Sequence, residues 1–382
     1  MENNTQLKEM IRSMVIDILQ GQKQEMASSQ PIKQAPRGQV EPGVFDTVDE
    51  AIQAAKAAQA RFEDCTLATR EKVIADIRAA MRPRVQELAQ KTVDETGMGR
   101  VADKVLKLNL TLNKTPGVED LVTECETGDN GMTLYELSAY GVIGAITPST
   151  NPAETLICNS IGMLAAGNAI FFSVHPGAKN LSRELVSELN QVIAKSIGIE
   201  NLIVTLREPS IESAQEMMLH PDVSLLVVTG GPGVVKQALQ SGKKVIGAGA
   251  GNPPAFVDET ADIKKAAQDI VLGASLDNNI LCIAEKSVVA MRQIEPQLVQ
   301  EMVKAGCILV ENQQDIQRLV DLTVLPNGTP NKKFVGKNAS VILDAAHIPY
   351  NGDPRLIIMR TPKDHPFAVI EMLMPILPVV TV

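Results

Sequence analysis

The sequence contains no tryptophan and few other aromatic side chains. Of its 382 residues, three are tyrosine and seven are phenylalanine, and 45 acidic residues against 36 basic ones give a net charge of −9. Proteins that bind nucleic acid need a cationic groove and aromatic platforms on which bases stack. Because the chain has neither a basic stripe nor such platforms, its composition argues against a nucleic-acid-binding function.

Cysteine and histidine are also scarce, and their spacing fits neither a disulfide framework nor a zinc site. No Cys-x-x-Cys pair occurs and no two of the four histidines stand at i, i+4. The sequence also lacks an apolar leader and any run of about 18 apolar residues. We therefore expect a reduced, cytoplasmic protein without structural zinc. The five cysteines are Cys65, Cys125, Cys158, Cys282 and Cys307.

What is present is the composition of a globular protein. Apolar residues make up 45% of the chain and charged residues 21%, values typical of folded soluble domains. At about 150 residues per domain, the length predicts two or three domains with a sizeable core.

The first 43 residues differ from the rest. Apolar residues recur at i, i+3, i+4 spacing over 2–20, which predicts a short amphipathic helix. Residues 21–43 are rich in Gln, Ser, Pro and Gly and predict a flexible linker. A tethered helix of this length gains too little from burial to fold alone, so we interpret it as a docking peptide for a partner surface. Packing on its own domain is the alternative, and a membrane surface is disfavoured because its polar face carries both charge signs.

From residue 44 onward, helical periods alternate with short β-branched runs. Helical patterns over 47–62 and 68–95 come first, and the strand-like runs AYGVIGAIT, NAIFFSV, NLIVTL and VSLLVVT then interleave with helices. A second series begins near residue 250, in which we expect AFV, KSVVAM, CILV, SVIL, RLIIM and PILPVVTV to be strands. This alternation predicts an α/β fold with parallel sheets, divided into domains at 44–250 and 251–382 with a cleft between them.

Neither a Gly-x-Gly-x-x-Gly fingerprint nor a P-loop occurs in the sequence. The nearest feature is the run Gly230-Gly231-Pro232-Gly233 between a predicted buried strand and a helix. Exposed N–H groups at a helix start favour a phosphate, and glycine permits its close approach. An ordinary tight turn fits the same residues, so both interpretations are open.

Two further residues have a structural and a catalytic interpretation. Asn151, in TPSTNPAET after a predicted strand, is either a helix N-cap or an amide donor aimed at a developing oxyanion. Cys282, in DNNILCIAEK, is either an inert core residue or a nucleophile. No protease-type His and Asp accompany it in the sequence, which leaves room for a thiol that attacks an already reactive electrophile such as an aldehyde.

Six ordered motifs together carry a family resemblance: TPSTNP, AAGNAIFFSVHPGAK, VVTGGPGVVK, GAGAGNPPAFVDETAD, NNILCIAEK and EMLMPILPVV. The chain resembles the aldehyde dehydrogenase superfamily over nearly its whole length. It is most similar to the CoA-acylating aldehyde dehydrogenases of bacterial microcompartments, which act on propionaldehyde or acetaldehyde in propanediol and ethanolamine utilisation.

The resemblance implies roles for individual residues. Cys282 matches the catalytic thiol, and Asn151 matches the amide that stabilises the oxyanion. The family's cofactor domain is a Rossmann variant without the glycine fingerprint, which fits the missing motif. Residues that match its NAD-binding positions are Pro148, Ser173, Thr229, Gly230, Gly231 and Glu371.

One departure from the hydrolytic relatives is informative. These relatives carry a glutamate 34 residues before the thiol, where this sequence has Ala248. Water, with a pKa near 15.7, needs a base to attack a thioester, whereas a thiol with a pKa near 8.5 is already about 3% thiolate at pH 7. The substitution therefore favours coenzyme A over water as the acyl acceptor.

The resemblance also implies an assembly. By that similarity, residues 1–20 are an encapsulation peptide that binds shell or cargo proteins, an arm near 128–142 serves oligomerisation, and the enzyme works inside a microcompartment as a homo-oligomer. Relatives continue beyond Val382, so we expect the catalytic domain to be incomplete. A non-catalytic cargo protein and a hydrolytic aldehyde dehydrogenase are the alternatives.

Overall fold

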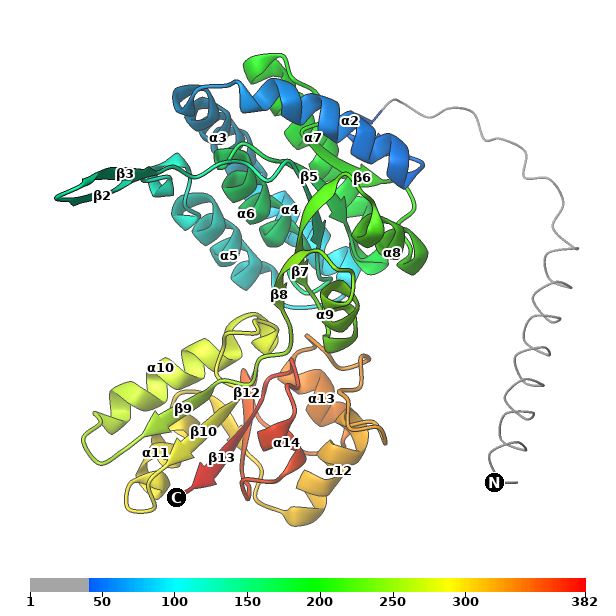
Figure 1. The fold of residues 1–382 in the computed structure, drawn as a ribbon. Coiled ribbons are helices and arrows are strands. Elements are labelled where there is room, and N and C mark those ends of the chain that lie inside the picture. The colour runs from blue at the N-terminus through cyan, green and yellow to red at the C-terminus, as the bar shows by residue number, and fades with distance from the viewer. Residues whose placement is uncertain (1–40) are drawn as a thin grey trace, which may run out of the picture. The chain divides into compact units, whose positions relative to one another are not determined.

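The computed structural model describes residues 41–382, whose framework is two parallel sheets (Figure 1). The expected helix at 1–20 and nearly all of the expected linker lie outside these residues. At the end of that linker, the Gly43 carbonyl accepts a hydrogen bond from the Thr205 N–H at 2.9 Å. The last linker residues are thus already bound to the first sheet.

The first lobe, residues 42–248, is built on a six-stranded sheet in the order β1-β6-β5-β4-β7-β8, with every neighbouring pair parallel. Its strands are β1 (Val44–Phe45), β4 (Val142–Ile146), β5 (Ala169–Ser173), β6 (Ile203–Leu206), β7 (Val223–Thr229) and β8 (Lys244–Ala248). Strands β4 and β5 are buried at every position, which explains their unbroken apolar sequence. Because the chain leaves β4 for β5 on one side and returns to β7 on the other, the sheet has a switch point between β4 and β7.

Helices surround this sheet and carry the apolar faces that bury it (Figure 1). They are α2 (Val48–Glu63), α3 (Leu67–Met81), α4 (Val85–Thr96), α5 (Val101–Lys114), α6 (Pro152–Ala165), α7 (Lys179–Ile197), α8 (Ile211–Leu219) and α9 (Pro232–Leu239). Short 3₁₀ turns occur at η1 (Arg82–Arg84), η2 (Val118–Asp120) and η3 (Pro176–Ala178). The exposed antiparallel hairpin of β2 (Glu124–Gly128) and β3 (Gly131–Tyr135) extends from this lobe.

The second lobe, residues 254–382, has a five-stranded parallel sheet in the order β11-β12-β13-β10-β9. Separate apolar clusters of buried side chains pack on this sheet. The strands are β9 (Pro254–Val257), β10 (Ser287–Ala290), β11 (Cys307–Leu309), β12 (Leu356–Arg360) and β13 (Ile376–Thr381). The helical elements are α10 (Ile263–Ser275), η4 (Leu276–Asn279), α11 (Glu295–Lys304), α12 (Gln313–Thr323), α13 (Ala339–Ala345) and α14 (Pro366–Val369).

The α/β class with parallel sheets is confirmed, but two local expectations are wrong. The run SVIL is part of helix α13, not a strand, because Ala339, Ile342 and Leu343 are buried at i, i+3, i+4 spacing. The helical pattern over 68–95 is two helices, α3 and α4, separated by the 3₁₀ turn at Pro83. Proline removes the N–H that a continuous helix would need there.

Candidate functional site

Several of the residues singled out in the sequence lie at the carboxyl ends of strands in the first sheet. Pro148 follows β4, Ser173 ends β5, and Thr229 ends β7. Ile146 and Val228 are partners in neighbouring strands, so β4 and β7 end at the same edge, at the switch point. Ligands of doubly wound sheets bind in the crevice outside this edge.

The glycine turn after β7 fits a phosphate group. Gly231 is the N-cap of α9, and no atom outside its own chain neighbours lies within 4 Å of the position its Cβ would take. The Gly230 N–H donates to the Ala248 carbonyl at 3.1 Å, which fixes the turn against β8. The open approach and the helix N-terminus behind it suit the pyrophosphate of a dinucleotide.

Asn151 occupies the N-cap position of α6, but its side chain makes no capping bond. Its Nδ2 donates to Thr150 Oγ1 at 3.2 Å, and its Oδ1 accepts a short hydrogen bond from the Nζ of Lys107 on α5. The amide is therefore held by side chains and not by the helix that it begins.

Cys282 lies in the loop between η4 and β10, and its side chain is exposed. The interpretation as an inert core residue does not hold for it. It applies instead to Cys307, which is buried and whose thiol pKa burial raises to about 12. Directly before this loop, η4 contains three consecutive left-handed residues, Asp277, Asn278 and Asn279, whose φ angles are 50°, 56° and 62°.

Lys286, four residues after Cys282, holds this loop from inside. Its Nζ donates to the carbonyls of Asn279 (2.8 Å) and Leu281 (2.7 Å) and makes a short bond to Asn279 Oδ1. Burial lowers the pKa of Lys286 to about 8, against the opposing attraction of Glu371, Cys282 and Glu285. The ammonium group of Lys286 therefore lies near the exposed thiol of Cys282.

Glu371 joins the same group of residues through Gly251. The Gly251 backbone N–H hydrogen bonds to the Glu371 carboxylate, whose pKa burial raises despite this bond and the charge of Lys286. A Cβ on Gly251 would lie 2.6 Å from the Cys282 carbonyl oxygen, so only glycine allows this approach. The structure therefore brings Glu371, Gly251, Lys286 and Cys282 together.

A buried ionic cluster links α5 and α6 to the start of the Cys282 loop. The Nζ atoms of Lys104 and Lys107 lie 3.0 and 2.5 Å from Asp277 Oδ2, and Lys107 lies 3.2 Å from Glu154 Oε1. Burial lowers the pKa of Lys104, whereas Glu154 and Asp277 outweigh burial and raise the pKa of Lys107. The sequence analysis did not predict this cluster. Its signal in the sequence was the pair Lys104 and Lys107, two lysines three residues apart among apolar residues.

Ala248 is the last residue of β8 and is exposed. Its methyl group can neither accept nor donate a proton.

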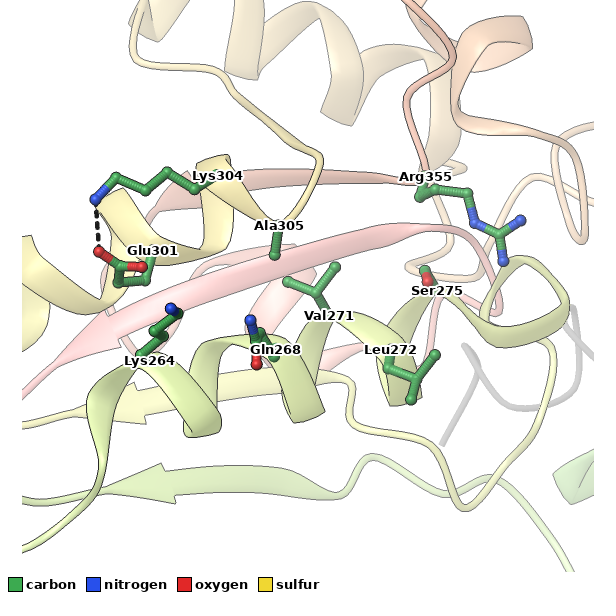
Figure 2. A pocket seen from close by; sticks show the side chains of 9 residues that line it. All are labelled: Lys264, Gln268, Val271, Leu272, Ser275, Glu301, Lys304, Ala305 and Arg355. Atoms are coloured by element: carbon green, nitrogen blue, oxygen red, sulfur yellow. Dashed lines mark hydrogen bonds and ion pairs between the residues drawn. The ribbon is translucent and has the colours of Figure 1, made fainter.

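A separate cavity of about 890 Å³ lies along α10 and α11 (Figure 2). None of the residues predicted as site residues lines it. Its lining residues are Lys264, Gln268, Val271, Leu272, Ser275, Glu301, Lys304, Ala305 and Arg355. Within residues 41–382, no cluster of His, Cys, Asp and Glu could hold a metal ion, and no helix has the length and hydropathy to cross a bilayer.

Comparison with known proteins identifies relatives of this chain. The model of the aldehyde dehydrogenase family matches residues 18–322. The chain is 47% identical over 381 residues to a propanal dehydrogenase (CoA-propanoylating) of Salmonella typhimurium, covering 100% of this chain and 80% of that protein. It is 44% identical to the acetylating acetaldehyde dehydrogenase EutE of Escherichia coli, covering 90% and 74% of the two chains. A propionaldehyde dehydrogenase of Rhodopseudomonas palustris, solved with bound CoA and an acylated cysteine, superposes with a TM-score of 0.87 at 47% identity, covering 90% of this chain and 79% of that chain.

Proposed function

We propose, on the premise that this chain belongs to the aldehyde dehydrogenase family, that it converts a short aldehyde and coenzyme A into an acyl-CoA with NAD(P) as oxidant. Propanal and acetaldehyde are the substrates named for relatives at 47% and 44% identity. The observation that carries the proposal is an exposed Cys282, in a loop that Lys286 holds near Glu371, in a chain whose position 248 is alanine.

In the proposed reaction, the Cys282 thiolate adds to the carbonyl carbon of the aldehyde, and the carbonyl oxygen becomes an alkoxide. Asn151 Nδ2 and the Cys282 N–H donate hydrogen bonds to this oxygen. Departure of the hydride from the same carbon leaves a thioester on Cys282. The thiolate of coenzyme A then attacks the thioester and releases Cys282, so two accessible steps replace one difficult step.

The NAD(P) that accepts the hydride fits residues of the first sheet and one residue of the second lobe. The open turn of Thr229, Gly230 and Gly231 would hold its phosphates at the α9 N-terminus. Pro148 and Ser173 would line the crevice at the ends of β4 and β5, and Glu371 would bind the nicotinamide ribose. Among solved relatives, an engineered glycolyl-CoA reductase carries NADP⁺. We assign residues 44–250 to cofactor binding and residues 251–382 to the thiol.

Hydrolysis of the thioester is disfavoured by Ala248. A water molecule attacking the thioester must lose a proton, and this position offers no base to accept it. Coenzyme A needs no such base because its thiol ionises readily near neutral pH.

Mass spectrometry of the peptide that contains Cys282 tests the proposal. With propanal and NAD, we expect an added propanoyl group, which disappears when coenzyme A is supplied. The variant C282A should form neither adduct nor NADH, whereas C158A, which removes another exposed thiol, should behave as wild type. No adduct in the wild type would indicate a non-catalytic cargo protein, and free propanoate formed without coenzyme A would indicate a hydrolase.

We also propose that residues 1–20 dock the enzyme on shell or cargo proteins of a microcompartment, and that the arm near 128–142, which includes β3 of the exposed hairpin, serves homo-oligomerisation. The compartment is supported by the similarity, at 46% identity and a TM-score of 0.86, to a propionaldehyde dehydrogenase from the fucose utilisation bacterial microcompartment of Clostridium phytofermentans. Deletion of residues 1–20 should leave turnover intact and abolish co-purification with shells. Unchanged packaging would contradict the docking role.

A further inference from the structure

The amide of Asn151 can serve an oxyanion only if its nitrogen, and not its oxygen, faces the substrate. An asparagine side chain presents an acceptor on one side and two donors on the other, and the two ends have nearly the same shape. What selects the orientation is therefore the set of groups around the amide.

Lys107 supplies this selection. An ammonium group has three donors and no acceptor, so only the Oδ1 of Asn151 can face the Lys107 Nζ. The nitrogen must then lie on the other side of the amide, where one of its hydrogens is bound by Thr150 Oγ1 at 3.2 Å. The second hydrogen is left for a ligand.

Lys107 itself has no freedom to turn away. Its Nζ donates to Asn151 Oδ1 and to Asp277 Oδ2, the latter at 2.5 Å, and it forms an ion pair with Glu154 Oε1 at 3.2 Å. Its side chain is 7% exposed and Asp277 is fully buried, so water does not compete for these bonds. One turn earlier on α5, Lys104 donates to the Thr150 carbonyl at 2.8 Å and holds the adjacent backbone.

From these contacts we infer that Lys107 is a positioning residue for the oxyanion site, a role that rests on the function proposed above. Lys107 fixes which end of the Asn151 amide meets the alkoxide. Through Asp277 it also fixes that amide to the segment from which the Cys282 loop begins.

The test is a double-mutant cycle with wild type, N151A, K107M and N151A/K107M, measured as kcat/KM for propanal at saturating NAD and coenzyme A. Removal of an oxyanion donor costs about 10²–10³-fold in kcat, and we expect a loss of about 10–100-fold for K107M. Because Lys107 acts through Asn151, the double variant should be no slower than N151A. The rate at which iodoacetamide alkylates Cys282 should stay at the wild-type value in K107M, since alkylation forms no oxyanion.

K107M leaves the buried Glu154 carboxylate without the ammonium group of Lys107, which destabilises the fold. A second variant that removes both charges separates this loss of stability from a loss of positioning. The variant K107M/E154Q should show the same loss as K107M, because a neutral glutamine needs no cationic partner. Three results would each overturn the role of Lys107. They are a double variant whose loss is the product of the two single losses, a wild-type rate in N151A, and slowed alkylation of Cys282 in K107M. These outcomes are distinct from turnover in C282A, which would contradict the proposed function itself.

Discussion

Lys286 is almost completely shielded from solvent, since only 3% of the residue is exposed. Three acceptors of the Cys282 loop surround its ammonium group, yet burial still lowers its pKa from an ordinary 10.5 to about 8. The folded protein therefore releases this proton about 2.5 pH units below the unfolded chain. Between these two values the unfolded state binds more protons, so the free energy of unfolding rises with pH.

We expect this rise to disappear in K286M. Between pH 7.5 and 10, the wild type should gain about 2 kcal/mol in the free energy of unfolding relative to K286M, because each pH unit of a lowered pKa corresponds to about 1.4 kcal/mol. Urea titrations at the two pH values measure it. K265M is a control without such a gain, since the pKa of Lys265 is raised by its partner Asp269. Equal pH dependence of wild type and K286M would contradict the depressed pKa.

At the scale of elements, the segment between β8 and β9 passes directly against the Cys282 loop. At Gly251 an added Cβ would meet the Cys282 carbonyl oxygen, and the Gly251 N–H binds the Glu371 carboxylate. A side chain there must push the Cys282 backbone away, whereas Gly233 in α9 has open space at its Cβ position.

Two glycine-to-alanine variants should therefore change the free energy of unfolding in opposite directions. G251A should lose about 1–3 kcal/mol through overpacking, with acyl transfer reduced at least tenfold because Cys282 moves. G233A should gain up to about 1 kcal/mol, because alanine is favoured over glycine inside a helix. Urea titration measures both free energies of unfolding. An unchanged value in G251A would show that the Cys282 loop accommodates the added methyl group without destabilisation.

At the scale of the whole described unit, polar contacts join the two lobes. Asp103 on α5 accepts from Arg355 Nη2 at 3.1 Å and from the Asp277 N–H at 2.9 Å. Arg100 donates to Asn278 Oδ1 at 3.0 Å. Because these bonds hold α5 of the first lobe against η4 of the second, they set the distance between the proposed oxyanion amide and the proposed nucleophile.

R355L should weaken this junction. The substitution leaves the carboxylate of Asp103, 9% exposed, without its charged partner, and we expect a loss of about 1–2 kcal/mol because Arg355 is itself one-third exposed. The matched control is K265M, which removes an exposed ion pair and should leave the free energy of unfolding at neutral pH unchanged within error. Losses of the same size in both variants would show that the Asp103 pair is not stabilising.

The pattern of short apolar runs and helices predicted the α/β class and most strands because strands buried on both faces, such as β4 and β5, leave a direct trace in composition. It failed for SVIL because four apolar residues fit either a strand or one side of a short helix. The helix α5 was not predicted, although it carries the lysines that organise the candidate site. Buried charges depend on partners far away in the chain, which periodicity does not contain.

The sequence by itself determined the fold class, the family and the residue types available for chemistry, because these follow from local pattern and ordered motifs. Only the tertiary structure decided that Cys282 is exposed while Cys307 is buried, and that the Asn151 amide is held by Lys107 instead of capping its helix. Solvent exposure and hydrogen-bond partners arise when segments more than a hundred residues apart, such as α5 and η4, come into contact.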